Sequence, residues 1–218
     1  MNSTLISTRY PKSIKHSSEA SVLKPGRNNK KLGWKITKGK WKGKYLYSLT
    51  LTERATCPTS CHHWDDCYGN NMPFAHRFDT RGLIQKLEQE IPQLLSKHKK
   101  GIVIRLHVLG DFYSVDYARF WQKMLVQYDD LCIFGYTARE LDSKIGRAIW
   151  LNNIRFSDRH VIRWSRNYTS DELGKWFAAE ESFDGNSFDC PEQTGKVDSC
   201  ADCGLCWTAQ KTVRFLSH

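Results

Sequence analysis

Between residues 45 and 165 the sequence alternates between strand-like and helix-like segments, and this order restricts the fold more than any other feature. Four segments have the two-residue alternation or short apolar run typical of strands: 45–52, 102–109, 131–136 and 160–165. Three segments between them have apolar residues at helical spacing: 79–98, 114–127 and 142–152. Asp79 is expected to cap the first helix and Pro92 to kink it. The βαβαβαβ order predicts an α/β fold, either an open, mostly parallel sheet or a partial (β/α) barrel, with ligands at the carboxyl ends of the strands.

The remaining segments suggest three parts: a basic N-terminal arm over 1–44, the α/β core over 45–168, and a Cys-rich C-terminal segment over 169–218 that packs on the core. A short helix is expected over 172–179. No apolar stretch reaches the roughly eighteen residues that a membrane span needs, and the N-terminus lacks the apolar run of a signal peptide. The prediction is therefore a cytoplasmic protein without a membrane partner.

The positive charge is concentrated near the N-terminus. The first fifty residues contain twelve of the 33 Lys and Arg residues but only one of the 23 acids, Glu19, so they carry a net charge of +11 while the rest carries −1. Such a segment suits nucleic acid or a phosphorylated substrate, or serves as a solvated tail. Lysines between positions 35 and 44 interleave with four aromatic residues that can stack on bases: Trp34, Trp41, Tyr45 and Tyr47. A β-hairpin with its turn at Gly39-Lys40 is the preferred interpretation.

Seven of the eight cysteines fall into two groups. The first is a C-x3-C-x5-C triad, and the second is C-x9-C-x2-C-x2-C. The two groups are Cys57, Cys61 and Cys67, followed by Cys190, Cys200, Cys203 and Cys206. The eighth, Cys132, lies within an apolar strand and is expected to be a buried structural thiol.

Three interpretations of the two groups compete. Disulfides need an oxidising compartment, which nothing in the sequence indicates. Zinc needs four nitrogen or sulfur ligands, and His62, His63 or His76 could complete a site with the triad. Iron-sulfur is favoured because C-x2-C-x2-C suits a four-iron cluster, with Cys190 as the fourth ligand. One or two 4Fe-4S clusters are expected, and a three-thiolate cluster would leave one iron open for a substrate or cofactor.

A strand, a three-cysteine loop and a βα series together resemble the radical S-adenosylmethionine superfamily over residues 45–168. More narrowly, C-P-x-x-C followed by C-Y-G-N-N and R-L-H-x-x-G-D-F is similar to phage and prophage proteins of the gene product 88 type. The first resemblance implies reductive cleavage of S-adenosylmethionine at the triad cluster, followed by a radical reaction on a nucleotide, nucleic acid or protein.

The superfamily resemblance also implies site residues. The usual triad is C-x3-C-x2-C, so the five-residue last interval here departs from it. Gly110 and Asp111 occupy the position of the Gly-Gly-Glu segment that holds the cofactor's amino group. Arg163 and Ser165 would meet the cofactor carboxylate, and the residues beside its ribose or the substrate would be Tyr136, Thr137 or Arg139.

Arg105, His107 and Asp111 would share one strand face by the two-residue period, and they are the expected catalytic residues. The alternative is structural: an internal Arg105–Asp111 salt bridge, with His107 bonded to the backbone. At the level of the whole protein, the alternative to an enzyme is a non-catalytic iron-sulfur or zinc protein that binds nucleic acid or senses redox state. Asn70 and Asn71 are expected to form a turn.

Overall fold

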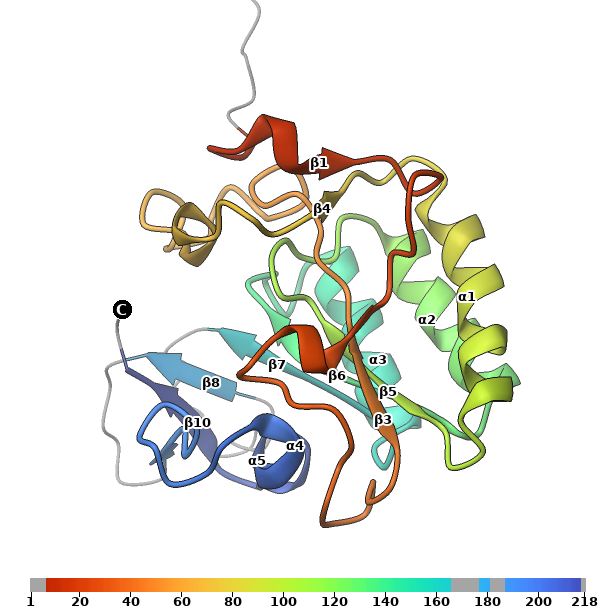
Figure 1. Ribbon diagram of the computed structural model, residues 1–218. Helices are drawn as coiled ribbons and strands as arrows, with labels where there is room; N and C mark the ends of the chain where they lie inside the picture. Colours follow the sequence, from red (N-terminus) through yellow and green to blue (C-terminus); the bar gives the residue numbers. More distant parts are fainter. Residues whose placement is uncertain (1–6, 166–176, 181–186, 217–218) are drawn as a thin grey trace, which may run out of the picture.

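An eight-stranded sheet forms the centre of the computed structural model, which describes residues 7–165 and 187–216 and the backbone of 177–180 (Figure 1). The strand order is β2-β3-β5-β6-β7-β8-β10-β9, and every pairing is parallel except that of β2 with β3. The strands are β2 (Lys24–Pro25), β3 (Tyr45–Ser48), β5 (Ile102–Leu106), β6 (Leu131–Thr137), β7 (His160–Ser165), β8 (Phe177–Glu180), β9 (Ser187–Asp189) and β10 (Thr212–Phe215). Because β2 and β9 are two separate edges, the sheet is open and no barrel closes.

Three helices cover one face of the sheet: α1 (Leu83–Lys97), α2 (Val115–Gln127) and α3 (Lys144–Arg155) (Figure 1). Two short helices, α4 (Cys200–Cys203) and α5 (Leu205–Thr208), lie on the opposite side. A separate pair of short parallel strands, β1 (Ile14–Lys15) and β4 (Arg77–Phe78), joins the N-terminal segment to the end of the triad loop. Three 3-10 turns complete the elements: Pro11–Ser13, Gly26–Asn28 and Tyr68–Asn71. No helix in the described residues is long and apolar enough to cross a membrane.

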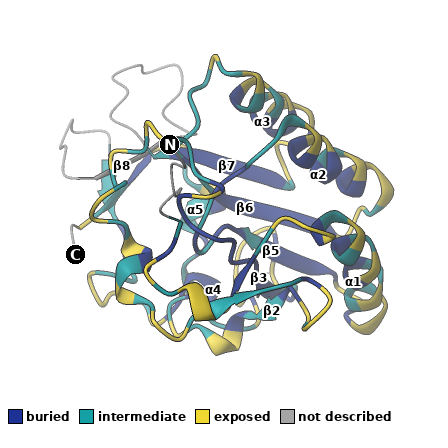
Figure 2. Cartoon of the chain, turned by 90° about the horizontal axis from the view of Figure 1, so that it is seen from above, coloured by how far each residue is buried: buried dark blue, intermediate teal, exposed yellow. Residues whose placement is uncertain are grey.

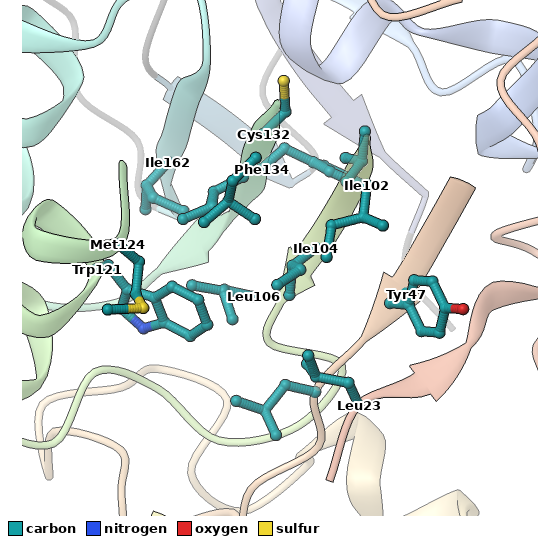
Figure 3. Packing of buried hydrophobic residues seen from close by; sticks show 14 of the residues in the cluster. Leu23, Tyr47, Ile102, Ile104, Leu106, Trp121, Met124, Cys132, Phe134 and Ile162 are labelled. Carbon is teal, nitrogen blue, oxygen red and sulfur yellow. The ribbon is translucent and has the colours of Figure 1, made fainter. Parts of the chain in front are cut away.

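The core packs on both faces of the sheet, against α1 to α3 on one and against the N-terminal segment and α5 on the other. The strands are buried, and the helices α1 to α3 expose their outer faces (Figure 2). Trp121 and Met124 of α2 point toward Leu106 of β5 (Figure 3). Cys132 is 1% exposed within this core, and burial raises the pKa of its thiol to about 12. The expectation of a buried structural cysteine is confirmed.

The four strands and three helices predicted between residues 45 and 165 are present, with corrected ends. Asp79 does not cap α1, because the helix begins after Gly82 in a left-handed conformation and the Asp79 carboxylate binds Arg81 instead. Ser114 and Ser143 cap α2 and α3 through their hydroxyls. Helical spacing alone could not predict these ends, because each cap depends on one local hydrogen bond.

The helix expected over 172–179 is wrong at its C-terminal end. Residues 177–180 form β8, which pairs with β7 and β10, and residues 172–176 lie outside the described residues. Pairing on both edges supplies the backbone hydrogen bonds that a short helix would otherwise make internally.

The described part of the basic N-terminal segment packs into the fold. Lys35 and Tyr45 form an antiparallel bridge, and Lys42 N–H donates to Gly39 C=O, so the expected hairpin is confirmed. Five apolar side chains of this segment are buried in the core: Val22, Leu23, Leu32, Ile36 and Trp41. The three-part division stays a prediction, and the N-terminal segment is an integral layer of the structure.

His160 at the start of β7 makes the fold sensitive to acid. Its side chain is fully buried and its Nδ1 bonds Asn153 Oδ1 at 2.6 Å. Burial lowers the pKa of His160 to about 3. Below about pH 6.5 the unfolded chain therefore binds a proton that the folded chain excludes, and the free energy of unfolding decreases as the pH is lowered. Between pH 7 and 5 this histidine is expected to cost about 2 kcal/mol of unfolding free energy.

Anaerobic urea unfolding at the two pH values measures this loss. His160→Asn keeps a donor for Asn153 but does not titrate. Its free energy of unfolding should therefore fall less between pH 7 and 5 than that of the unmodified chain, by the amount attributed to His160. Equal pH dependence in the two proteins would contradict the assignment.

Candidate metal centre

The four C-terminal cysteines line one small cavity. Cys190 follows β9, Cys200 and Cys203 begin and end α4, and Cys206 lies in α5. The remaining wall is largely apolar and includes Phe188, Leu205, Trp207 and Val213. The sequence spacing left open whether Cys190 lies near the other three cysteines. In the structure all four line the same cavity.

Backbone contacts with distant segments hold these cysteines in place. Cys200 N–H donates to Lys31 C=O at 2.8 Å, and Cys190 N–H donates to Arg214 C=O at 2.8 Å. Gly204, with φ of 76°, makes the sharp turn between α4 and α5 that only glycine adopts readily. Trp207 stacks on Trp41 of the N-terminal segment, with ring centroids 5.0 Å apart.

Arg163 secures the end of this segment. Its buried guanidinium donates to the carbonyls of Cys206, Lys211 and Ala209 at 2.7–3.0 Å. The superfamily resemblance placed Arg163 on a cofactor carboxylate, whereas here it binds the chain that carries Cys206. Arg139 is similar, because it donates to the carbonyls of Phe112 and Thr56 and so ties the triad loop to the sheet.

A buried ion pair supports the triad loop. Arg77 and Glu53 lie at 2.7 Å, and both side chains are almost completely buried. Glu53 also accepts from Thr8. Arg77 donates further to the carbonyls of three loop residues, Gly69, Met72 and Ala75. The loop is therefore shaped by one cation bound to its backbone.

Arg54 binds the middle of the same loop. It donates to Trp64 C=O at 2.8 Å and to the Asn70 side chain at 2.9 Å. Asn70 donates in turn to Asp65 C=O and lies in the 3-10 turn Tyr68–Asn71, so the expected turn is confirmed. The sequence analysis missed the roles of Glu53, Arg54 and Arg77. Charged residues that flank a polar loop are common on surfaces, and nothing local shows that these are buried.

Burial favours the protonated form of several thiols in the two groups. Burial raises the pKa of Cys57 to about 12, with a further rise from the nearby Asp111 carboxylate. Burial also raises the pKa of Cys67, Cys190 and Cys203. Within the described residues no three His, Cys, Asp or Glu side chains are arranged to hold a single metal ion.

A cleft of about 280 Å³ separates the two cysteine groups. It lies where β5, β6 and β7 end, the edge at which ligands of parallel sheets bind. Its polar and sulfur-bearing wall includes Cys57, Cys61, His62, His63, Arg105, His107, Asp111, Tyr136, Thr137, Ser165, Cys190, Cys200 and Cys206. Of the three histidines considered as zinc ligands, two are in this wall, and His63 also bonds Asp66.

Asp111 is buried at the inner end of the cleft. One oxygen accepts from the Thr137 hydroxyl at 2.7 Å, and the other accepts from Ala138 N–H at 2.8 Å. Burial raises the pKa of Asp111 to about 6, and these hydrogen bonds oppose part of the rise. Gly110, with φ of 80°, allows this approach, because a Cβ there would lie 2.5 Å from the Thr56 hydroxyl.

The expected shared strand face is wrong in its geometry, although its residues do meet. β5 ends at Leu106, so the two-residue period does not continue to His107 and Asp111. The structural alternative is wrong as well: Arg105 donates to Leu106 C=O, and His107 Nε2 bonds the Tyr117 hydroxyl rather than the backbone. All three side chains nevertheless line the cleft.

Tyr136 and Ser165 also reach the cleft wall, as expected for residues at strand ends. The Tyr136 hydroxyl donates to Cys206 Sγ at 3.0 Å, and burial raises its pKa well above the ordinary value. A hydroxyl that donates to a sulfur can stabilise that sulfur as a thiolate. Tyr136 thus links the cleft to the four-cysteine cavity.

Fold and site together define an open, mostly parallel α/β-sheet protein with two cysteine groups beside one cleft. The chain is similar to the Gene 88 protein of Mycobacterium phage D29, at 22% identity over 187 residues, which covers 78% of this chain and 76% of the relative. It is likewise similar to the Gene 88 protein of Mycobacterium phage L5, at 21% identity over 192 residues with the same coverage. The expected similarity to gene 88-type phage proteins is confirmed. No protein-family model and no solved structure matches.

Proposed function

We propose that this chain is an iron-sulfur protein whose C-terminal cysteines hold a four-iron cluster. The observation that carries the proposal is the common cavity of Cys190, Cys200, Cys203 and Cys206. Four thiols and otherwise largely apolar walls fit such a cluster, which needs four thiolates and exclusion of water. Arg163 fixes the Cys206 backbone, and the Tyr136 hydroxyl donates to its sulfur.

A cage-shaped cluster fits this arrangement better than zinc. Tetrahedral zinc with Zn–S bonds of about 2.3 Å draws its four sulfurs to within about 3.8 Å of each other. Here the four cysteines line one cavity, and within the described residues no three His, Cys, Asp or Glu side chains are placed to hold a single ion. Zinc remains the outcome that metal analysis must exclude.

For the triad we propose a second cluster with one open iron, and an enzyme that resembles the radical S-adenosylmethionine superfamily. When bound, such a cluster supplies the electron that cleaves S-adenosylmethionine reductively. Cys57 and Cys61 belong to the cleft wall, so the triad would hold its cluster beside the cleft. Asp111 can accept from an ammonium group there, since its Oδ2 receives one hydrogen bond and retains acceptor capacity.

Metal analysis tests the cluster proposal. The chain purified without oxygen is expected to contain about four iron and four sulfide ions for one cluster, or about eight of each for two, with little zinc. Stoichiometric zinc without sulfide would refute it.

A separate assay tests the enzyme. Dithionite and S-adenosylmethionine should yield 5′-deoxyadenosine and methionine. A full complement of clusters with no product would favour the non-catalytic alternative, a protein that binds nucleic acid in a salt-dependent manner.

A further inference from the structure

The cleft contains an arginine whose hydrogen-bonding capacity is mostly unused. Arg105, at the end of β5, donates one hydrogen bond, to Leu106 C=O at 3.0 Å, and makes no ion pair within the described residues. Its guanidinium lies over the Tyr136 ring at 4.6 Å and over the Phe134 ring at 5.5 Å. The aromatic rings hold the cation in place, while most of its five N–H groups lack a protein acceptor.

His107 adds a second donor to the same wall. Its side chain is 4% exposed, and its Nδ1 has no hydrogen-bond partner in the described residues. The other ring nitrogen, Nε2, lies 2.9 Å from the Tyr117 hydroxyl. If Tyr117 donates to Nε2, the network is satisfied and the ring proton is on Nδ1. Burial lowers the pKa of His107 to about 3, so the ring is neutral.

Acidic side chains are scarce among the described residues that line this cleft. Asp111 is the one acidic side chain among the lining residues in the described part of the chain, and its oxygens accept from Thr137, Phe112 and Ala138. Lys31 at the rim adds another cation, which pairs with Glu192 at 3.3 Å. A cleft with unused donors and a single acidic side chain is suited to a ligand rich in acceptors.

We propose that Arg105 and His107 bind the phosphate of a nucleotide, either free or within a nucleic-acid strand. A guanidinium can engage two oxygens of a phosphate, and the His107 N–H can donate to the third oxygen of a monoester or share an oxygen of a phosphodiester. Tyr68, which is 45% exposed, and Phe215 line the same cleft and can stack on a base. This names the substrate class of the proposed enzyme, and it rests on the proposed function only for the reaction that follows binding.

Binding of adenosine monophosphate to the full chain, purified without oxygen, tests the phosphate site by calorimetry. The nucleotide is expected to bind more tightly than adenosine, and Arg105→Gln to weaken it by about tenfold to a hundredfold with little effect on adenosine. Arg105→Lys keeps the charge without the fork and should be intermediate. The matched control is Arg119→Gln on the exposed face of α2, which removes the same charge and should change affinity less than twofold.

A short single-stranded oligonucleotide identifies the source of the phosphate. Tighter, more salt-dependent binding than the monophosphate would assign a strand, and equal or weaker binding would assign the free nucleotide. The proposal is overturned if neither probe binds the unmodified chain, if adenosine binds as tightly as its monophosphate, or if Arg105→Gln weakens only S-adenosylmethionine. Iron content of the same samples separates this outcome from failure of the cluster proposal, since phosphate binding requires no metal.

Discussion

Cys203→Ser is expected to remove one complete cluster, so that iron and sulfide each fall by about four per chain. Cys203 is one of four thiols around the C-terminal cavity, and it is only partly buried, so serine costs little packing. A hydroxyl is a poor replacement for a thiolate ligand. Cys61→Ser in the triad should cause a separate loss, and the double variant should lose both clusters if the chain holds two.

Cys132→Ala is the matched control for these variants. It also removes a thiol, but one that is buried in β6 and lines neither the four-cysteine cavity nor the cleft. Its iron content should match that of the unmodified chain, although its stability will fall. Unchanged iron in both serine variants, or equal loss in the alanine control, would contradict the assignment of ligands.

Loss of the C-terminal cluster should also loosen the N-terminal segment. Lys31 and Leu32 accept backbone hydrogen bonds from Cys200 and Ala201, and Thr37 donates to Ala201. Because metal binding stabilises the folded segment that carries the thiols, these backbone contacts depend on it. Amide hydrogen exchange should therefore increase in 31–41 in Cys203→Ser. No increase there would show that the segment packs independently of the metal.

Much of the sheet could be predicted from the sequence because its signals are local. Apolar runs such as 131–136 and 160–165 needed no knowledge of their partners, and the observed β6 and β7 nearly coincide with them. The cysteine groups were equally visible, since ligand spacing is itself a local pattern. The expectation that ligands bind at the carboxyl ends of parallel strands then predicted that Arg105, His107 and Asp111 lie near one another. They line one cleft, although β5 ends before His107 and Asp111.

The rest depended on contacts between segments far apart in the chain. Nothing near Arg163 indicates that its partners are three carbonyls more than forty residues later. β8 is a strand because β7 and β10 flank it, and the burial of Trp41 depends on Trp207. The superfamily resemblance assigned Arg139 and Arg163 to the cofactor or substrate by sequence position alone. In the structure both side chains donate hydrogen bonds to loop carbonyls and so stabilise the loops.

Glu53→Gln is expected to reduce the free energy of unfolding by about 3 to 5 kcal/mol, because it leaves the Arg77 guanidinium buried without its counterion. The two side chains are 1% and 0% exposed and lie at 2.7 Å, so water cannot replace the lost carboxylate. Urea unfolding under anaerobic conditions measures the loss. The change is nearly isosteric, so a large effect would come from charge rather than from a cavity.

The same substitution at an exposed ion pair distinguishes the effect of burying the pair from the effect of the ion pair itself. Glu88 binds Lys123 at 2.8 Å, but these side chains are 39% and 64% exposed, so Glu88→Gln should change stability by about 1 kcal/mol at most. Because Arg77 also binds the carbonyls of Gly69, Met72 and Ala75, Glu53→Gln should disturb the triad loop and lower its iron content before the C-terminal site is affected. Similar losses from the two substitutions would mean that Glu53 contributes only an ordinary surface interaction. An undisturbed triad would mean that Arg77 holds the loop without its partner.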